Sequence, residues 1–195
     1  MSRAAACGAL VLCSACTAVP ALAARPGASQ PGQPVLRVDV DGDGSPDLVG
    51  AVPGGIVVST AEGTLALRTA GRLDGIIRLP GVREAVLLLR ARSGSDGFVD
   101  GLYRLRGSQL ERLHVEGGIG DGVATAVVGR TYVDVDCGAP PRSIAQIELE
   151  ALGRLWRRTE LTFVLRGARF VLAHEGSHVV TISKATHRRC AVVRR

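Results

Sequence analysis

The sequence predicts an antiparallel all-β domain. Short runs rich in Val, Leu and Ile recur along the chain, and most of its 25 glycines fall between these runs. Many short strands at regular spacing, each bounded by turn residues, are typical of an all-β sandwich or barrel. The predicted strands are residues 35–40, 48–52, 56–60, 65–69, 85–90, 102–106, 123–128, 131–135 and 144–149.

Residues 143–156 are the best candidate for a helix. Ile144, Ile147 and Leu155 could share one helical face, together with the leucines between them. Gly153 and the preceding Pro140-Pro141 pair interrupt a helix and favour turns. The segment is therefore predicted to form a pair of strands.

An internal echo supports a repeated β-hairpin. Residues 103–110 (YRLRGSQL) align with residues 163–170 (FVLRGARF) at an offset of 60, and residues 85–90 then fall opposite 145–150. Each copy has an Arg-Gly turn between apolar residues, as hairpins do. A period of about 60 residues gives too few copies for a closed propeller. The prediction is a sandwich or a partial assembly of propeller-blade-like repeats, and a complete propeller would require several chains.

The N-terminus resembles a secretory signal peptide. Residues 1–23 contain Arg3, a short apolar run over residues 4–11, and a small-residue cleavage site that ends at Ala23. Leu12-Cys13-Ser14-Ala15-Cys16 also resembles a bacterial lipobox, which would place a lipid anchor on Cys16. Secreted or extracytoplasmic localisation is predicted, with attachment to the cell envelope by lipid as the alternative.

The remaining chain is predicted to be a flexible linker followed by one domain. Residues 24–34 are rich in Pro, Gly, Ala, Ser and Gln, and residues 35–195 make up the all-β domain. Two of the five cysteines, Cys137 and Cys190, lie outside the signal, and an exported pair predicts a disulfide. Closing a loop of about 50 residues would stabilise the fold by about 3–4 kcal/mol on a chain-entropy model.

Composition weighs against several classes of partner. The formal charge of +6 comes almost wholly from scattered arginines, and the chain has only six aromatic residues. Few side chains can therefore stack on bases or sugars, which disfavours binding of nucleic acid or carbohydrate. No apolar run approaches the ~20 residues of a transmembrane helix, so no transmembrane segment is predicted.

One acidic loop carries the strongest indication of a ligand. Acidic residues occupy positions 1, 3, 5 and 9 of a loop that has Gly44 at position 6, and position 7 could offer a backbone carbonyl. Calcium takes six to eight oxygens in flexible geometry, so this spacing predicts a calcium site. The predicted ligands are Asp39, Asp41, Asp43, Ser45 and Asp47. The alternative is a solvated acidic turn, since Asp and Gly favour turns for local reasons.

The loop and the strand after it, DVDGDGSPDLVGAVP over residues 39–53, resemble the calcium-loop element of FG-GAP (VCBS-type, integrin-alpha-like) repeats. The resemblance implies a loop between two adjacent strands, with the four aspartates as side-chain ligands. An EF-hand has a similar start, but it needs a bidentate Glu at position 12, which is Gly50 here.

A second motif suggests zinc. His174-Glu175-Gly176-Ser177-His178 fits HExxH, which on a helix places two histidines one turn apart with a glutamate as general base. Gly176 and Ser177 are poor helix formers, and the flanking residues favour a strand. The only later candidate for a third ligand is His187, at no familiar spacing.

The sequence therefore predicts a calcium-stabilised β-domain that is secreted or held at the cell envelope. It would be non-catalytic and act as a structural or interaction module for an unknown protein or envelope partner, in one version docking that partner through the bound calcium. The alternative is a secreted zinc metallopeptidase that uses His174, Glu175 and His178.

Overall fold

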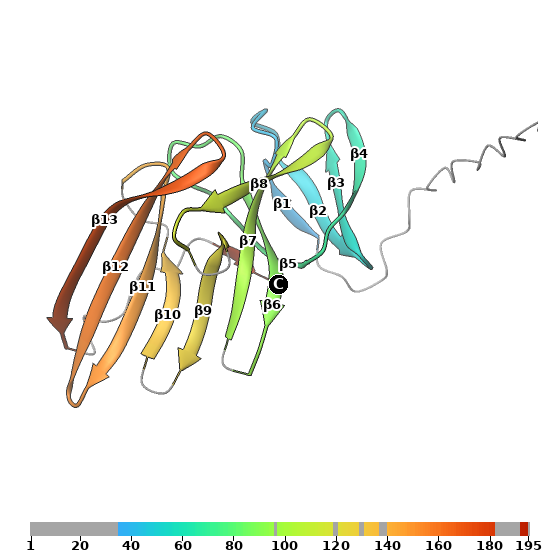
Figure 1. Cartoon of the computed structure of the whole chain (residues 1–195). Coiled ribbons are helices and arrows are strands. Elements are labelled where there is room, and N and C mark those ends of the chain that lie inside the picture. Colours follow the sequence, from blue (N-terminus) through green and yellow to red (C-terminus); the bar gives the residue numbers. More distant parts are fainter. Residues whose placement is uncertain are drawn as a thin grey trace, which may run out of the picture.

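The computed structural model describes residues 35–95, 97–118, 121–128, 131–136, 140–181 and 192–194. These residues form an all-β fold of two sheets, which confirms the predicted fold class (Figure 1). No helix among them is long and apolar enough to cross a membrane. The predicted signal, linker and lipid anchor (residues 1–34) and both cysteines of the predicted disulfide lie outside the described residues.

The smaller sheet is a four-stranded antiparallel meander in the order β1-β2-β3-β4. Its strands are β1 (Leu36–Val38), β2 (Asp47–Val52), β3 (Gly55–Thr60) and β4 (Gly63–Arg68). The acidic loop joins β1 to β2, so it lies between two adjacent strands as the resemblance implies. Val52 pairs with Gly55 across Pro53-Gly54, where the positive φ of Gly54 (73°) suits a type II turn.

The larger sheet has the strand order β14-β5-β6-β7-β8-β13-β12-β11-β10-β9. Its strands are β5 (Arg72–Ile77), β6 (Val86–Ser93), β7 (Gly97–Arg106), β8 (Gln109–Val115), β9 (Val123–Val128), β10 (Thr131–Asp136), β11 (Ser143–Leu152), β12 (Leu155–Arg166), β13 (Arg169–Val180) and β14 (Val192–Arg194). Strand β9 also pairs with β7, because the sheet curls into a half-barrel (Figure 1). Among the described strands, only β8 and β13 pair in parallel.

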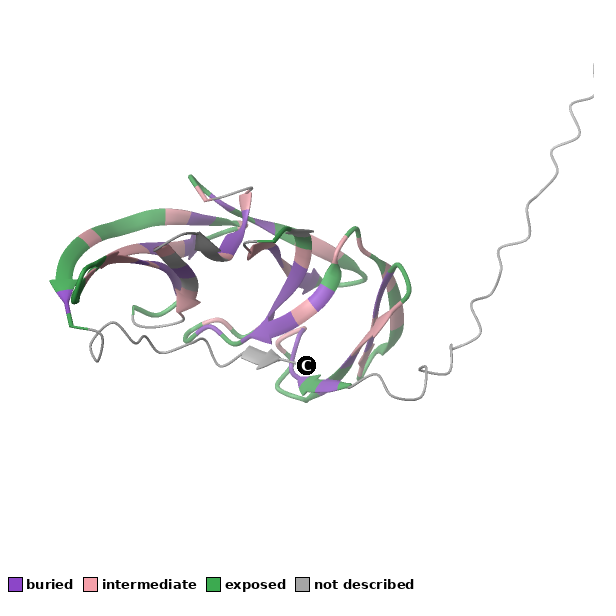
Figure 2. Cartoon of the chain, turned by 90° about the horizontal axis from the view of Figure 1, so that it is seen from below, coloured by how far each residue is buried: buried purple, intermediate pink, exposed green. Residues whose placement is uncertain are grey.

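Strands β6 and β7 are buried on both faces. Val86 and Leu88 of β6 belong to an inner core inside the curl, together with Phe163 and Phe170 from the far side of the sheet. Leu87 and Leu89 face the other way, into a sandwich core shared with the small sheet. Figure 2, coloured by burial, shows buried residues concentrated in the middle of the molecule. Burial on both faces accounts for the uninterrupted apolar run of β6, since a strand with one wet face alternates.

The two echoed segments form equivalent hairpins. Arg106 pairs with Gln109 across Gly107-Ser108, and Arg166 pairs with Arg169 across Gly167-Ala168. Both turns place the glycine at positive φ, 54° and 62°, in the first central position of the turn. The register continues identically for several residues, so the sequence echo corresponds to a structural one.

The strands that precede these hairpins do not keep the same register. Leu87 of β6 lies opposite Tyr103, whereas Ile147 of β11 lies opposite Glu160 rather than the echoed Phe163. The difference is a shift of three residues. Strand β11 reaches β12 through the tight Gly153-Arg154 turn, and β6 reaches β7 by a longer loop.

The helical alternative for residues 143–156 is wrong, because these residues form β11 and the start of β12.

Candidate metal centre

Three of the five predicted calcium ligands form a cluster. Asp39, Asp41 and Asp43 each offer a carboxylate oxygen, and these oxygens lie within 4.8 Å of one another. Asp39 is buried, Asp41 is half-buried and Asp43 is exposed, so the cluster lies at the rim of the fold.

The loop holds each carboxylate with its own backbone. Gly42 N–H and Gly44 N–H donate to the two oxygens of Asp39, at 2.7 and 3.0 Å. The amides of Asp43 and Ser45 donate to Oδ1 of Asp41 and of Asp43, at 3.1 and 2.6 Å. An ionised carboxylate has about four lone-pair sites, so these bonds orient the side chains and leave capacity for an ion.

Asp47 lies outside the cluster of three. It is 2% exposed, and its Oδ2 accepts a hydrogen bond of 2.8 Å from Val40 N–H, which ties the end of the loop to its beginning. Burial raises the pKa of Asp47; the carboxylates of Asp41 and Asp43 raise it further, while backbone hydrogen bonds oppose the rise. Ser45 is exposed and contributes the amide described above.

The loop is docked against the large sheet. The carbonyl of Asp39 accepts a hydrogen bond of 3.2 Å from Ala85 N–H, immediately before β6. A methyl group added to Gly42 would lie 3.1 Å from Cβ of Arg83 and 3.2 Å from Cγ of Glu84. The acidic loop is therefore part of the contact between the two sheets.

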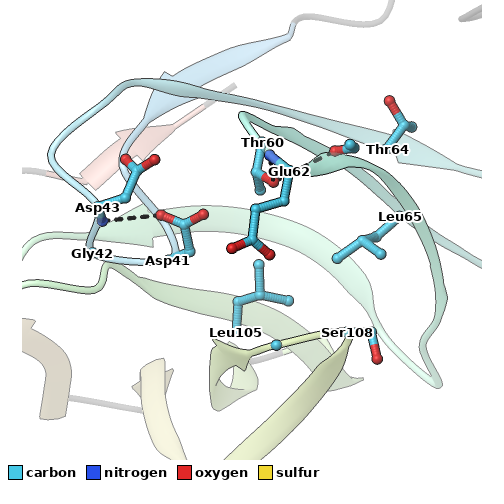
Figure 3. Close-up of a pocket in the computed structure, with 11 residues that line it drawn as sticks. Asp41, Gly42, Asp43, Thr60, Glu62, Thr64, Leu65, Leu105 and Ser108 are labelled. Carbon is cyan, nitrogen blue, oxygen red and sulfur yellow. Dashed lines mark hydrogen bonds between the residues drawn. The ribbon is translucent and has the colours of Figure 1, made fainter.

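A cleft of about 490 Å³ opens beside the loop. Asp41 and Asp43 line one side, and the β3–β4 and β7–β8 turns provide the rest (Figure 3). Glu62 extends from the β3–β4 turn toward Leu105 at the base of the cleft. Glu62 could not be identified from the sequence, because its turn reaches the loop only through the folding of the small sheet.

The HExxH residues lie on strand β13. His174, Glu175 and His178 are all exposed. Side chains alternate along a strand, so the histidines share one face and Glu175 points to the other. Four residues of strand span about 13 Å, against about 6 Å on a helix. The structure does not bring these residues together, and His187 lies outside the described residues.

No family model, curated protein or solved structure matches this chain. The resemblance to FG-GAP repeats therefore depends on the loop residues themselves. Among the described residues, Asp39, Asp41 and Asp43 are the group of metal-ligating side chains close enough to hold an ion together. Their donors are all hard carboxylate oxygens, which fit calcium.

Proposed function

We propose that this protein is a calcium-stabilised, non-catalytic β-domain, secreted or held at the cell envelope, that acts as a structural or interaction module. The observation that carries the proposal is the position of the Asp39, Asp41 and Asp43 cluster in a loop that is hydrogen-bonded to Ala85, immediately before β6. The export part of the proposal depends on the signal-like residues 1–23.

The donor set favours calcium over other ions. Zinc sites use mainly Cys and His, and the cluster has neither. Magnesium demands near-ideal octahedral geometry and retains several waters, whereas calcium accepts irregular arrangements of oxygens. Asp39, Asp41 and Asp43 would hold the ion, while Asp47 would fix the shape of the loop through Val40.

A bound ion would stabilise the contact between the two sheets. Three carboxylates within a few ångströms repel one another, and a divalent cation would reverse that repulsion. Because the carbonyl of Asp39 also accepts the hydrogen bond from Ala85, an ordered loop would also order the residues that lead into β6. An ion that binds only the folded state stabilises it by about 2.7 kcal/mol at a concentration 100 times its Kd.

The cleft beside the loop supports the interaction part of the proposal. It combines the carboxylates of Asp41, Asp43 and Glu62 with apolar surface from Leu65 and Leu105. A partner that entered this cleft would lie next to the ion and could donate an oxygen to it. The calcium loop would then serve both the fold and the partner.

The test is thermal unfolding of metal-stripped protein with calcium, magnesium or zinc added separately. We expect calcium to raise Tm most. Asp43→Asn keeps an oxygen that can accept from Ser45 N–H but removes the charge, and Asp43→Ala removes both. In calcium, Asp43→Asn should melt as the wild type does in chelator, and Asp43→Ala should melt at or below that temperature.

Two outcomes would contradict the proposal. An Asp43→Asn variant that keeps the full calcium response would mean that Asp43 only caps the loop. A rise in Tm with zinc alone would instead favour the metallopeptidase, and Glu175→Gln would then be tested for loss of peptidase activity. Glu150→Gln, which removes an exposed carboxylate paired with Arg157 on the other sheet, is the matched control.

A further inference from the structure

Three charged side chains meet on adjacent strands of the large sheet, away from the acidic loop. Nη2 of Arg90 lies 2.5 Å from Oδ1 of Asp74, and its Nε lies 3.5 Å from Oδ1 of Asp100. The guanidinium carbon is 3.4 Å from the centre of the Phe98 ring, a cation–π contact. Asp100 is only 4% exposed, so this cluster is largely removed from water.

Two β-bulges create the cluster. The pairing of β5 with β6 shifts between Leu73 and Gly75, which makes Asp74 the extra residue. The pairing of β6 with β7 shifts just after Arg90, which lies directly opposite Asp100. Bulges re-aim side chains, and here both occur where the charged side chains converge.

The cluster has two carboxylates for one cation. Oδ2 of Asp74 is buried, and no described residue donates a hydrogen bond to it. Asp74 and Asp100 contact the same guanidinium in a site largely removed from water, which disfavours ionisation of both groups and favours a proton on Asp100. A proton on Asp100 would supply the missing donor to Asp74 and leave the cluster with no net charge.

Other charged residues lie on the paired strands around this cluster. Exposed Arg72 lies opposite Arg90 in the pairing of β5 with β6, and Arg194 of β14 occupies the position opposite Gly75. Strand β9, which pairs with β7 at Asp100, has no titratable residue between Val123 and Val128. Asp74 and Arg90 are therefore the charged groups that decide the ionisation of Asp100.

We propose that Asp100 retains a proton in mild acid and donates it to Asp74 beside Arg90, and that this contact is a pH-sensitive link that holds β5, β6 and β7 together more tightly as the pH falls. The proposal is independent of the calcium loop. It predicts a domain whose large sheet gains stability under acidic conditions, in which many folds lose it.

The direction follows from proton linkage. Burial raises the pKa of Asp100 from 3.8 to about 6, with repulsion from Asp74 adding to the rise and Arg90 opposing it. The folded state therefore holds the proton more tightly than the unfolded state. This stabilisation is fully present below 3.8 and is lost as the pH rises through about 6. Between pH 8 and pH 5, the folding equilibrium constant should rise about tenfold from this group.

The test is urea unfolding of the wild type and Asp100→Asn at pH 5 and pH 8, with chelator present so that calcium contributes nothing. The Asn amide can donate to Asp74 at any pH. In the wild type, Asp100 should raise the folding equilibrium constant about tenfold between pH 8 and pH 5. We expect Asp100→Asn to lose this contribution and the control Glu150→Gln to keep it. An Asp100→Asn variant with the wild-type pH dependence would overturn the proposal.

A second measurement, on the wild type, tests the proposal even if Asp100→Asn fails to fold. Carboxyl-carbon NMR of the wild type should show an aspartate with a midpoint near 6. Asp74→Asn should lower this midpoint, because it removes the neighbouring carboxylate. If every described aspartate titrated with a midpoint below about pH 4.5, the proposal would also be overturned.

Discussion

The acidic loop and the Asp74–Arg90–Asp100 cluster bring carboxylates together in different ways. In the loop, residues two apart in sequence converge at the rim, and backbone N–H groups orient them. In the buried cluster, three strands contribute one residue each, and an arginine lies between the carboxylates. The first arrangement can recruit a cation from solution, whereas the second already has a cation and can balance its remaining charge with a proton.

The difference shows how burial decides the way in which like charges are offset. At an exposed site water screens the repulsion, so a carboxylate cluster can persist and exchange its ion. In an interior, desolvation penalises every uncompensated charge, so the counter-charge must be part of the fold or the group must become neutral. Three substitutions test this difference between the two sites.

The largest effect is expected for Arg90→Met. The change leaves Asp74 and Asp100 in the interior without their cation, and removing one partner of a buried ion pair costs about 3–5 kcal/mol. Urea unfolding at pH 8 measures the loss, which should shrink at pH 5 as a carboxylate takes up a proton. Arg157→Met, which breaks an exposed pair with Glu150, should cost less than about 1 kcal/mol. Equal losses would mean that the buried cluster behaves as a surface pair does.

An intermediate effect is expected for Gly42→Ala. Gly42 has a φ of 86°, which costs an L-residue about 1–2 kcal/mol, and its new methyl group would press on Arg83 and Glu84. Gly44→Ala has a similar φ of 93° but no atom within 4 Å, so it isolates the backbone strain. Thermal unfolding in chelator should show a larger loss for Gly42→Ala. The same loss in both variants would mean that the loop does not depend on its contact with the large sheet.

The smallest effect is expected for Glu62→Gln. Glu62 is exposed and reaches the cleft without belonging to the cluster of three, so it would attract calcium only at a distance. The Kd for calcium, measured from the shift in Tm, should rise by less than about threefold. A loss as large as that of Asp43→Asn would make Glu62 a direct ligand and enlarge the proposed centre.

The acidic loop could be predicted because its spacing is local. Asp39, Asp41 and Asp43 fall within five residues, and the turn that gathers them is encoded by the glycines between them. The HExxH motif is equally local, but its chemistry depends on a helix that the β-rich flanks do not form. The same five residues on strand β13 place the two histidines too far apart for that motif.

Strand β5 was missed for a physical reason. The apolar residues Leu73, Ile76 and Ile77 of this strand neither alternate strictly nor form a continuous run, so neither of the usual strand patterns applies to Arg72–Ile77. The bulge absorbs Asp74, and Arg90 from the next strand pairs with it. The partner is 16 residues away in the sequence, so no local pattern could have identified it.

The all-β class, the two echoed hairpins and the acidic loop can be predicted from the chain, because turns and alternation depend on residues a few positions apart. The parallel contact of β8 with β13, the pairing of β9 with β7, and the meeting of Asp74, Arg90 and Asp100 arise only in the folded protein. These contacts join residues that are distant in sequence. Which distant strands meet depends on which of their faces bury apolar side chains together, and those faces meet only when the whole sheet has formed.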